Sequence, residues 1–334
     1  MSKGLILVTG AAGFIGSHVV RELLAVGRKV RATAREPRKA NFLRDLPIKE
    51  GGSLEIIRME LLEHESVAVA VKGCEDIIHC AAALYVGAMD LQKDVVDPSI
   101  KGTENLVAAI NANDSVKRIV HTSSVAAVRR TDFTDGETFS NQDWCDDAVL
   151  KTNAYGLAKA GAEKLIREWW GELDAERKPR LVTIHPSIVI GPIMAKRHLK
   201  GSMAYVDHLL KRKPPFVLNS HINMVDVRDV AAAHVKALDM GIVGGRYIVH
   251  SGSLWHREMS VILSRGIPER KWPKRQLPKS LTYIVSLFHP LISWNWVKKN
   301  IGTTCYYDTK QTEEELEMKW IPMSKSIVDG AASV

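Results

Sequence analysis

The chain has 334 residues, of which 46% are hydrophobic and 25% are charged, and this predicts a folded protein with a large core rather than a disordered or fibrous one. Its net charge of +8 is spread among acidic residues without a nucleic-acid-binding motif, no stretch has the ~20 apolar residues of a membrane-spanning helix, and the four cysteines form no CxxC pair. We therefore expect a cytoplasmic protein, monomeric or homodimeric, that binds neither nucleic acid nor membranes.

Short apolar runs rich in β-branched residues alternate with stretches of helical periodicity through the first 190 residues. This alternation predicts parallel strands joined by crossover helices, which is the α/β doubly wound parallel sheet. Such a sheet binds its ligands beyond the carboxyl ends of its strands. The expected strands span residues 5–9, 30–34, 54–58, 77–80, 118–123 and 181–184, and the expected helices include 15–26, 98–111 and 153–170.

Three glycines stand between the first expected strand and the first expected helix. Gly10 permits a tight turn, Gly13 lets the backbone approach a pyrophosphate, and Gly16 lets the helix pack closely on the strand. The free amides and the positive end of the helix then face the anion. This context predicts a dinucleotide-binding cradle and makes the expected sheet Rossmann-type.

The end of the second expected strand indicates which dinucleotide binds. An acidic residue there favours NAD by binding the adenosine ribose, whereas an arginine favours NADP by pairing with the 2′-phosphate. Arg35 stands at this position, and Arg38 or Lys39 adds a second positive charge. We expect NADP(H) as the cofactor, although Glu36, one residue on, leaves binding of the ribose hydroxyls open.

Tyr155 and Lys159 lie four residues apart and therefore share one face of an expected helix. A tyrosine is a poor acid–base catalyst near neutral pH unless a nearby positive charge stabilises its phenolate, which Lys159 can do. The pair alone is common by chance, but Ser124 stands at the end of the fifth expected strand, one strand-to-helix step upstream. We expect Ser124 to bind a substrate carbonyl and Tyr155 to supply its proton, while a nicotinamide supplies the hydride.

Beyond Gly191 and Pro192 the pattern becomes irregular, with a helix-like run at 227–238, a strand-like run at 245–250 and a tryptophan-rich tail. We expect residues 1–190 to form the cofactor-binding domain, with 222–250 returning to it. Residues 191–221 and 251–334 are expected to form a smaller carboxyl-terminal substrate lobe. The apolar stretch 280–297 is expected to be a core or pocket-lining segment, with docking at a membrane surface as the alternative.

The motif TGxxGxxG, which begins at Thr9, resembles the glycine motif of the short-chain dehydrogenase/reductase superfamily. The length of the chain is similar to that of the extended branch of this superfamily. Longer stretches at 30–37, 116–128 and 155–164 resemble the dihydroflavonol reductase and cinnamoyl-CoA reductase group, whose near relations include the 3β-hydroxysteroid dehydrogenases. The similarity runs to the tail, at 308–310 and 320–322. Members of that group are typically NADP(H)-dependent reductases of ketones or aldehydes, so the resemblance implies the same reversible reaction here.

The resemblance also implies roles for individual residues. It places the pyrophosphate on the glycine cradle, the 2′-phosphate on Arg35, and the nicotinamide beside residues 186–189, with Ser124, Tyr155 and Lys159 catalytic. Two positions depart from the group: Ser99 stands where many extended members have asparagine, which leaves the proton relay beyond Lys159 open, and Glu60 stands where an aspartate usually meets adenine. The expected cofactor-binding residues are Thr9, Gly10, Gly13, Phe14, Ile15, Gly16, Arg35, Lys39, Glu60, Leu61, Ala81, Ala82, Thr122, Tyr155, Lys159, Pro186, Ile188 and Val189.

The substrate is expected to lie against loops that follow strand ends, because such loops vary between proteins of this architecture. The candidate substrate-binding residues are Tyr85, Val125, Arg129 and Tyr205. Three histidines, His79, His121 and His185, stand near the ends of strands expected to be neighbours, but no acidic or cysteine partner recurs at ligand spacing. We expect hydrogen-bonded histidines and no metal site.

Three other functions stay open. A nucleotide-sugar epimerase or dehydratase would use the same cradle and Tyr–Lys pair; dehydratases carry an acidic pair where this chain has Ser123 and Ser124, and epimerases generally prefer NAD, against Arg35. A 3β-hydroxysteroid dehydrogenase linked to membranes is the second. A non-catalytic NADP-sensing protein is the third, and such proteins commonly lack the tyrosine or the lysine that this chain retains.

Overall fold

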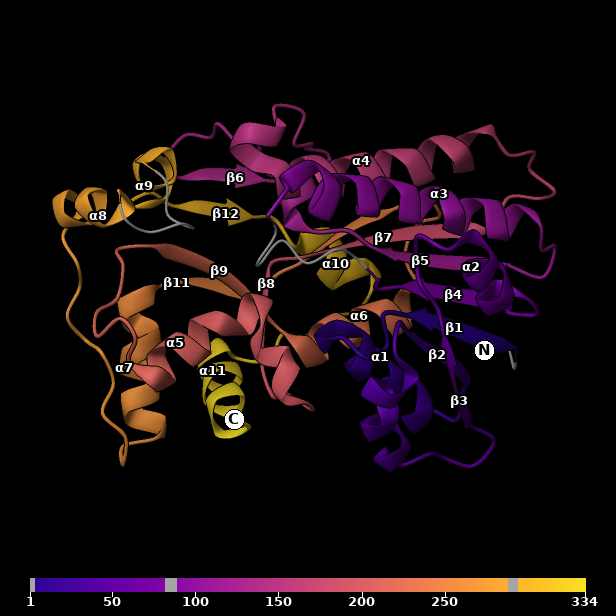
Figure 1. Cartoon of the computed structure of the whole chain (residues 1–334), viewed down its shortest axis with the longest axis horizontal. Coiled ribbons are helices and arrows are strands. Elements are labelled where there is room, and N and C mark those ends of the chain that lie inside the picture. The colour runs from indigo at the N-terminus through magenta and orange to yellow at the C-terminus, as the bar shows by residue number, and fades with distance from the viewer. Residues whose placement is uncertain (1–3, 82–88, 288–293) are drawn as a thin grey trace.

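The computed structural model describes residues 4–81, 89–287 and 294–334. A parallel sheet of seven strands, the central sheet, has the strand order β10-β7-β5-β4-β1-β2-β3 and lies on the right in Figure 1. This confirms the Rossmann-type fold and the six expected strands. The strands are β1 (Leu5–Thr9), β2 (Lys29–Ala34), β3 (Ser53–Arg58), β4 (Asp76–His79), β5 (Arg118–Thr122), β7 (Arg180–Pro186) and β10 (Arg246–Val249).

The strand order explains where a ligand can bind. From β1 the chain proceeds outward through β2 to β3, and then returns to β4 on the other side of β1. At this switch point the connections leave in opposite directions, which opens a crevice beyond the carboxyl ends of β1 and β4. Val8 of β1 is in register with Ala32 of β2 and Ile78 of β4, so Thr9 and the cradle begin at that edge.

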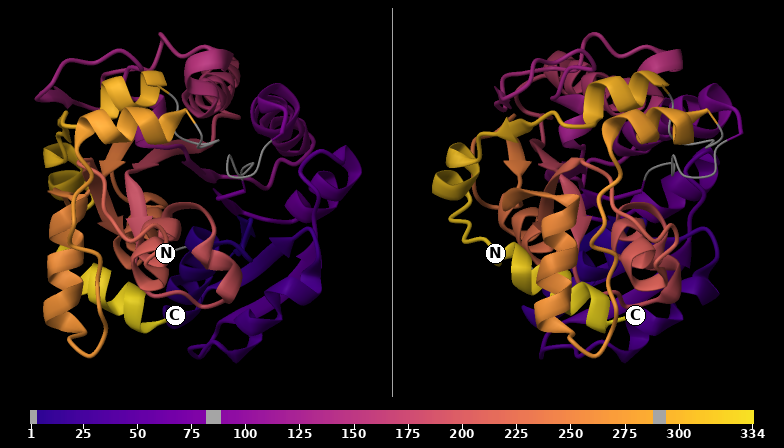
Figure 2. Two further views of the ribbon diagram at one scale, coloured as in Figure 1. Left: turned by 60° about the vertical axis from the view of Figure 1, so that its left-hand side comes forward. Right: turned by 90° about the vertical axis from the view of Figure 1, so that its left-hand side faces the viewer.

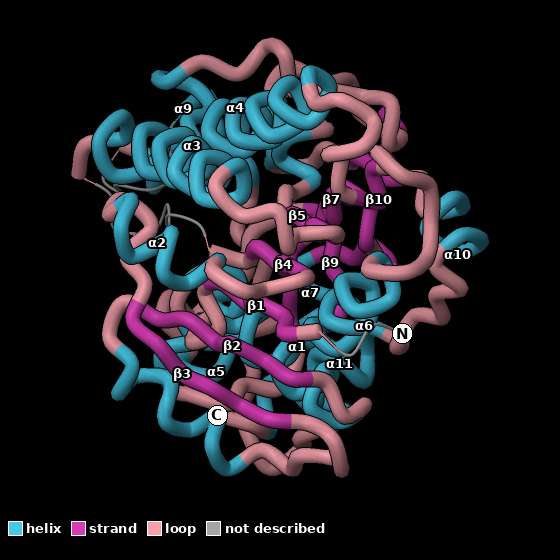
Figure 3. The backbone as a smooth tube through the Cα atoms, turned by 90° about the vertical axis from the view of Figure 1, so that its right-hand side faces the viewer, coloured by secondary structure: helices cyan, strands magenta, loops and turns pink. Residues whose placement is uncertain are grey.

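Helices cover both faces of the central sheet (Figure 3), and this is why β4 is buried along its whole length. One face is covered by α1 (Phe14–Ala25) and α6 (Val227–Ala237), which pack on each other. The other is covered by α2 (His64–Val71), α3 (Asp97–Asn111) and α4 (Leu150–Glu172). Each layer has its own apolar core, with Val8 on the first side and Leu7 on the second, as the alternation of a strand requires.

A second, three-stranded sheet, the small sheet, follows the end of β7. Together with α5, α7 and α11 it forms what we call the small-sheet region, in which α11 packs on α7 (Figures 1 and 2). The strands are β8 (Ile188–Ile190), β9 (His221–Asp226) and β11 (Gly252–Trp255), and the helices are α5 (Ala204–Lys211), α7 (His256–Gly266) and α11 (Met323–Ala332).

Residues 222–250 are shared between the two sheets. β9 pairs with β8 and β11 in the small sheet, whereas α6 and β10 lie at the central sheet. Tail residues also return to the first part of the chain, because β12 (Cys305–Tyr307) pairs in parallel with β6 (Glu137–Phe139). The domain boundaries expected from the sequence therefore stay a prediction.

The apolar stretch 280–297 falls on two short helices, α8 (Lys279–Ser286) and α9 (Trp294–Asn300), with residues 288–293 outside the described ranges. Leu281, Ile284 and Trp294 are about half exposed, so these side chains are not core residues, and the expected pocket-lining role of the segment stays a prediction. The remaining helix, α10 (Lys310–Glu315), packs beside β10. In the part of the chain that the structure describes, no helix is long and apolar enough to cross a membrane.

Candidate active site

The glycine cradle joins β1 to α1 in a tight turn, in which Gly10 and Gly16 lie too close to other backbone atoms to carry a side chain. Gly10 has a φ of +62°, and a Cβ on it would lie 2.9 Å from the backbone of Ala81. A Cβ on Gly16 would lie 2.4 Å from the carbonyl oxygen of Gly10. Gly13 caps α1 without a side-chain hydrogen bond, so the first amides of the helix face outward. These features fit the phosphates of a dinucleotide.

Thr9 fixes the cradle to the neighbouring strand. Its hydroxyl accepts a hydrogen bond from the Ala81 amide at 3.0 Å and lies 2.9 Å from Nδ1 of His79 at the end of β4. Thr9 is fully buried, so its side chain holds the crevice in shape. Of the residues expected beside adenosine, Ala82 lies outside the described ranges.

The adenosine side of the site carries a charged cluster after β2. Arg35 is exposed there, and Glu36 pairs with Arg38 at 2.9 Å and with Lys39. Hydrogen bonds from Lys39 and Arg38 lower the pKa of Glu36. Because two cations occupy the Glu36 carboxylate, it does not pair with Arg35, for which the described residues offer no acidic partner. Glu60 and Leu61 follow the neighbouring β3, and their contact with adenosine stays a prediction.

The helix that carries Tyr155 and Lys159 begins within α4, after a kink at Asn153. Asn153 has a non-helical φ of −155° and ψ of 64°, and its Oδ1 accepts a hydrogen bond from the Gly156 amide at 2.9 Å. This is a helix N-cap, so Tyr155 and Lys159 belong to a helix that begins at Asn153. A Cβ on Gly156 would lie 2.4 Å from the Asn153 side chain, which explains the glycine between them. The expected helix 153–170 thus begins at the residue that caps it.

Lys159 is bound to the end of β5, where Ser124 follows. Its ammonium donates to the carbonyl oxygen of Thr122 at 3.2 Å, and Lys159 is buried. Ser124 Oγ accepts the Ala126 amide at 3.1 Å and is partly exposed. The structure therefore brings the helix of Tyr155 and Lys159 onto the strand end that carries Ser124, and the 3-10 turn after Ser124 packs on α4.

A buried carboxylate, Glu163, lies one helical turn beyond Lys159. It accepts hydrogen bonds from Ser123 at 2.6 Å, from Arg246 at 2.8 Å and from His185 at 2.7 Å. Burial alone would raise the pKa of Glu163, but His185 and Arg246 hold it well below its usual range. Glu163 thus ties α4 to β7, to β10 and to Ser123 at the end of β5. Its partners come from distant segments, and so no local sequence pattern singles it out.

The three histidines considered above as metal ligands contact each other or other side chains. His79 and His121 stack with ring centroids 5.3 Å apart, and burial lowers the pKa of His79 to about 3. His185 is hydrogen-bonded to Glu163. No group of three or more metal-ligating side chains is found within residues 4–81, 89–287 and 294–334. Ser99, at the position where asparagine is common, donates to the Val95 carbonyl and lines a cavity of about 10 Å³ with His79, His121 and Lys159.

The expected nicotinamide wall lies where β7 passes into the small sheet. Pro186 ends β7, and Ile188 and Val189 begin β8. Between them, Ser187 Oγ lies 3.2 Å from Nδ1 of His250, which follows β10. The Ser187–His250 contact therefore joins this segment to the end of β10, which pairs with β7 in the central sheet.

The expected substrate residues are only partly brought together. Tyr85 lies outside the described ranges, and Val125 begins the turn after Ser124. Arg129 lies over the ring of Phe133, 4.8 Å from its centroid, with Nη1 3.7 Å from Sγ of Cys305. Burial raises the pKa of Tyr205, and the positive charge of Arg129 opposes that rise. The role of both residues in substrate binding stays a prediction.

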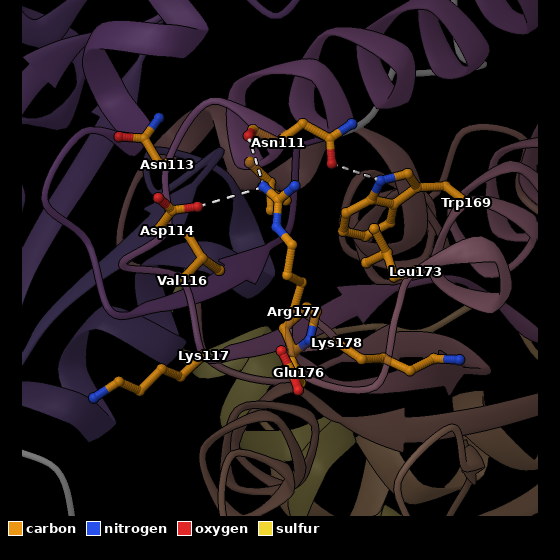
Figure 4. Close-up of a pocket in the computed structure, with 12 residues that line it drawn as sticks. Asn111, Asn113, Asp114, Val116, Lys117, Trp169, Leu173, Glu176, Arg177 and Lys178 are labelled. Carbon is orange, nitrogen blue, oxygen red and sulfur yellow. Dashed lines mark hydrogen bonds and ion pairs between the residues drawn. The ribbon is translucent and has the colours of Figure 1, made fainter.

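Another pocket, with a volume of about 400 Å³, lies at the amino ends of β5 and β7, and Figure 4 shows residues that line it. Its Arg177 is directed to Asp114 at 3.4 Å, and Trp169 donates to Asn111 at 2.9 Å. Ligands of a doubly wound sheet bind at the carboxyl ends, so we assign the chemistry to the cradle side.

Comparisons with known proteins agree with this geometry. The model of the NAD dependent epimerase/dehydratase family matches residues 6–249. The chain is 32% identical over 285 residues to "Cinnamoyl-CoA reductase CAD2" of Medicago truncatula, covering 81% of this chain and 83% of that protein. It is 29% identical to "Dihydroflavonol 4-reductase" of Zea mays, covering 82% and 77%. These matches confirm the resemblance to the reductase group.

Solved structures share the fold over almost the whole chain. The yeast methylglyoxal/isovaleraldehyde reductase Gre2, solved with NADPH, superposes with a TM-score of 0.79 at 25% identity, covering 98% of this chain and 97% of that one. Vestitone reductase from alfalfa superposes with a TM-score of 0.75 at 25% identity, covering 99% and 98%.

Proposed function

The chain belongs to the NAD dependent epimerase/dehydratase family, and we propose that it is an NADPH-dependent reductase that converts a small ketone or aldehyde reversibly into an alcohol. The observation that carries this proposal is the binding of the Lys159 ammonium to the strand end that precedes Ser124, next to the glycine cradle. The curated relatives named as reductases support reduction, and the NADPH complex of Gre2 supports the choice of cofactor.

Ser124 and Tyr155 would act at the substrate carbonyl oxygen. Because Ser124 Oγ accepts the Ala126 amide, its own O–H can be donated to that oxygen. Tyr155 would give its phenolic proton to the same oxygen as negative charge develops there, which is general acid catalysis. NADPH, when bound, supplies the hydride to the carbonyl carbon. In the reverse direction the Tyr155 phenolate would take the proton from the alcohol.

Lys159 would stabilise the phenolate and hold the cofactor. Its ammonium has three N–H donors, and one is given to the Thr122 carbonyl. We expect the other two to serve the nicotinamide ribose and the phenol of Tyr155. Since Lys159 is buried, its charge acts on Tyr155 with less screening than in water.

The cofactor cavity would be bounded by the residues expected from the sequence. The amides of Phe14 to Gly16 would bind the diphosphate, Arg35 would pair with the 2′-phosphate, and Pro186 to Val189 would lie against the nicotinamide. The occupied carboxylate of Glu36 supports NADP(H) over NAD, because two cations already compete with ribose hydroxyls for it.

The second candidate is a nucleotide-sugar epimerase, which the name of the matching family model favours. An epimerase returns the hydride to its substrate, so it would retain its dinucleotide and would not change NADPH absorbance with any carbonyl. Net oxidation of NADPH on a panel of ketones, aldehydes and hydroxysteroids separates the two functions, and a response to hydroxysteroids alone would favour a steroid dehydrogenase.

The test of the catalytic assignment is Tyr155→Phe on any carbonyl that the wild-type protein reduces. We expect the rate to fall by about 10²–10⁴-fold, because the proton donor is lost, while binding of NADPH is retained. Tyr306→Phe is the matched control, since Tyr306 is an exposed residue of β12, and it should leave the rate unchanged. An unchanged rate in Tyr155→Phe would overturn the assignment and favour the NADP-sensing alternative.

A further inference from the structure

A turn of the small-sheet region lies directly on the glycine cradle. The 3-10 helix Lys196–Leu199 follows β8, and two of its side chains reach the carbonyl oxygen of Ala12. Arg197 donates from Nε at 3.2 Å, and His198 Nε2 lies at 3.1 Å. The contact joins residues 185 positions apart in the chain. A segment expected to serve the substrate therefore touches the loop expected to hold the cofactor phosphates.

His198 fixes this turn in place. The Met194 amide lies 3.4 Å from its Nδ1, so the proton sits on Nε2 and is donated to Ala12. The ring is buried, with the rings of Phe14 and Phe42 each 5.7 Å away. Nearby, Nε2 of His18 lies 2.9 Å from the carbonyl oxygen of Pro192, which anchors the chain just before the turn. Because His198 and His18 are both buried, their two contacts fix the backbone on either side of Met194 and so restrict where Arg197 can lie.

Arg197 is half-buried and differs from the buried arginines in its charge partners. Arg28 pairs with Asp76, and Arg246 pairs with Glu163. Among the described residues, no carboxylate lies within ion-pair distance of Arg197, whose guanidinium lies 5.3 Å from the centroid of the Phe42 ring. Burial lowers the pKa of Arg197, and no acidic group offsets that effect. A desolvated cation without a counter-charge is unfavourable, so this side chain stands ready for an anion.

We propose that Arg197 binds the diphosphate of the dinucleotide and closes the cradle from the side opposite the α1 amides. Nε is held by Ala12, which leaves Nη1 and Nη2 as a planar pair of donors suited to two phosphate oxygens. Stacking on Phe42 and the Ala12 contact preorganise the fork, so little freedom is lost on binding. The inference rests on the proposed use of NADP(H), but it concerns binding and not turnover.

The two phosphate groups of NADPH give distinguishable outcomes. The 2′-phosphate is present only in NADPH, whereas the diphosphate is present in both NADPH and NADH. Removing a residue that binds the diphosphate must therefore weaken the binding of both cofactors by the same factor. Removing a residue that binds the 2′-phosphate, as expected of Arg35, must weaken the binding of NADPH alone.

The experiment is titration of the wild-type protein, Arg197→Met and Arg35→Met with NADPH and with NADH, followed by nicotinamide fluorescence without any carbonyl present. Methionine keeps the apolar stem over Phe42 and removes the charge. We expect Arg197→Met to raise both Kd values equally, by about 10-fold to 100-fold, because hydrogen bonds to a charged group are lost. Arg35→Met should raise the Kd of NADPH alone.

Lys196→Met is the matched control, because Lys196 is the exposed neighbour in the same turn, and both Kd values should stay at wild-type levels. Melting temperatures of all variants exclude misfolding, and Arg197→Lys should recover part of the affinity. Unchanged Kd values in Arg197→Met, or a rise for NADPH alone, would overturn the diphosphate assignment. If the wild-type protein binds NADPH yet reduces no carbonyl, the proposed function fails and the role of Arg197 is still decided.

Discussion

The proposed cofactor side and the proposed substrate side of the candidate active site are assembled in different ways. The cradle on the cofactor side, Gly10 to Gly16, joins one strand to one helix in sequence order, and the neighbouring strands of the sheet are β2 and β3. On the substrate side, Arg129 after β5 and Asn223 of β9 both contact Sγ of Cys305 on β12, at 3.7 Å and 3.3 Å. A local motif therefore determines the cofactor side, while contacts between distant segments determine the substrate side.

Glu163 joins the two kinds of assembly, and its removal is the strongest way to break the comparison. In Glu163→Gln, Arg246 and Arg167 lose the carboxylate that neutralises them in the core. We expect a loss of about 3–5 kcal/mol in the free energy of unfolding, because a buried charge is left without its partner. Denaturant unfolding monitored by circular dichroism measures this loss.

The pH dependence of that loss has a definite sign. The pKa of Glu163 is depressed in the folded protein, so its stabilisation is present above its unfolded pKa of about 4.5 and disappears as the pH falls towards the folded value. The difference between wild type and Glu163→Gln should thus be largest near neutral pH and should shrink below about pH 4.5. A difference independent of pH would show that the variant acts through packing alone.

Gly16→Ala tests the cofactor side by itself. The added Cβ would lie 2.4 Å from the Gly10 carbonyl oxygen and 2.9 Å from Cα of Ala11, so the helix and the turn must move apart. We expect a loss of about 1–3 kcal/mol in stability and at least a tenfold rise in the Kd of NADPH.

The control for this substitution is Gly171→Ala. Gly171 lies in α4 and a Cβ there meets nothing within 4 Å, so alanine should be neutral or stabilising by about 0.5–1 kcal/mol. Wild-type affinity for NADPH in Gly16→Ala would contradict the local origin of the cradle.

Arg129→Met tests the substrate side and has the smallest expected effect. If Arg129 contacts the substrate, KM for a reducible carbonyl compound should rise by about tenfold through the loss of a hydrogen bond, while the Kd of NADPH stays unchanged. Steady-state kinetics together with the fluorescence titration measure both quantities.

Arg130→Met is the matched control, because Arg130 is the exposed neighbour and pairs with Glu137 on β6. It should change neither constant. A parallel change in KM and in the Kd of NADPH for Arg129→Met would mean that the two sides are coupled through Arg129.

The contact of Arg197 and His198 with Ala12 sharpens the comparison from another direction. One element of the small-sheet region therefore touches the glycine cradle. Tyr205, a candidate substrate residue, follows this turn in α5. The proposed cofactor side thus also includes a contact between distant segments.

The sequence by itself determined the central sheet, the cradle and the shared helix face of Tyr155 and Lys159. Each of these depends on residues close together in the chain: buried strands on apolar runs, a turn on Gly10, and a shared helix face on a spacing of four. Hydrophobic burial and backbone geometry act over such short spans, so the pattern of residue types is sufficient.

Only the tertiary structure decided the partners of Glu163, the pairing of β6 with β12, and the placement of Arg197 on Ala12. Sequence patterns gave the type of each side chain, but the partner depends on which distant segments the fold brings within a few ångströms. A buried charge or a parallel strand pair is stabilised by contacts between distant segments, and the residues next to it in the sequence do not indicate those contacts.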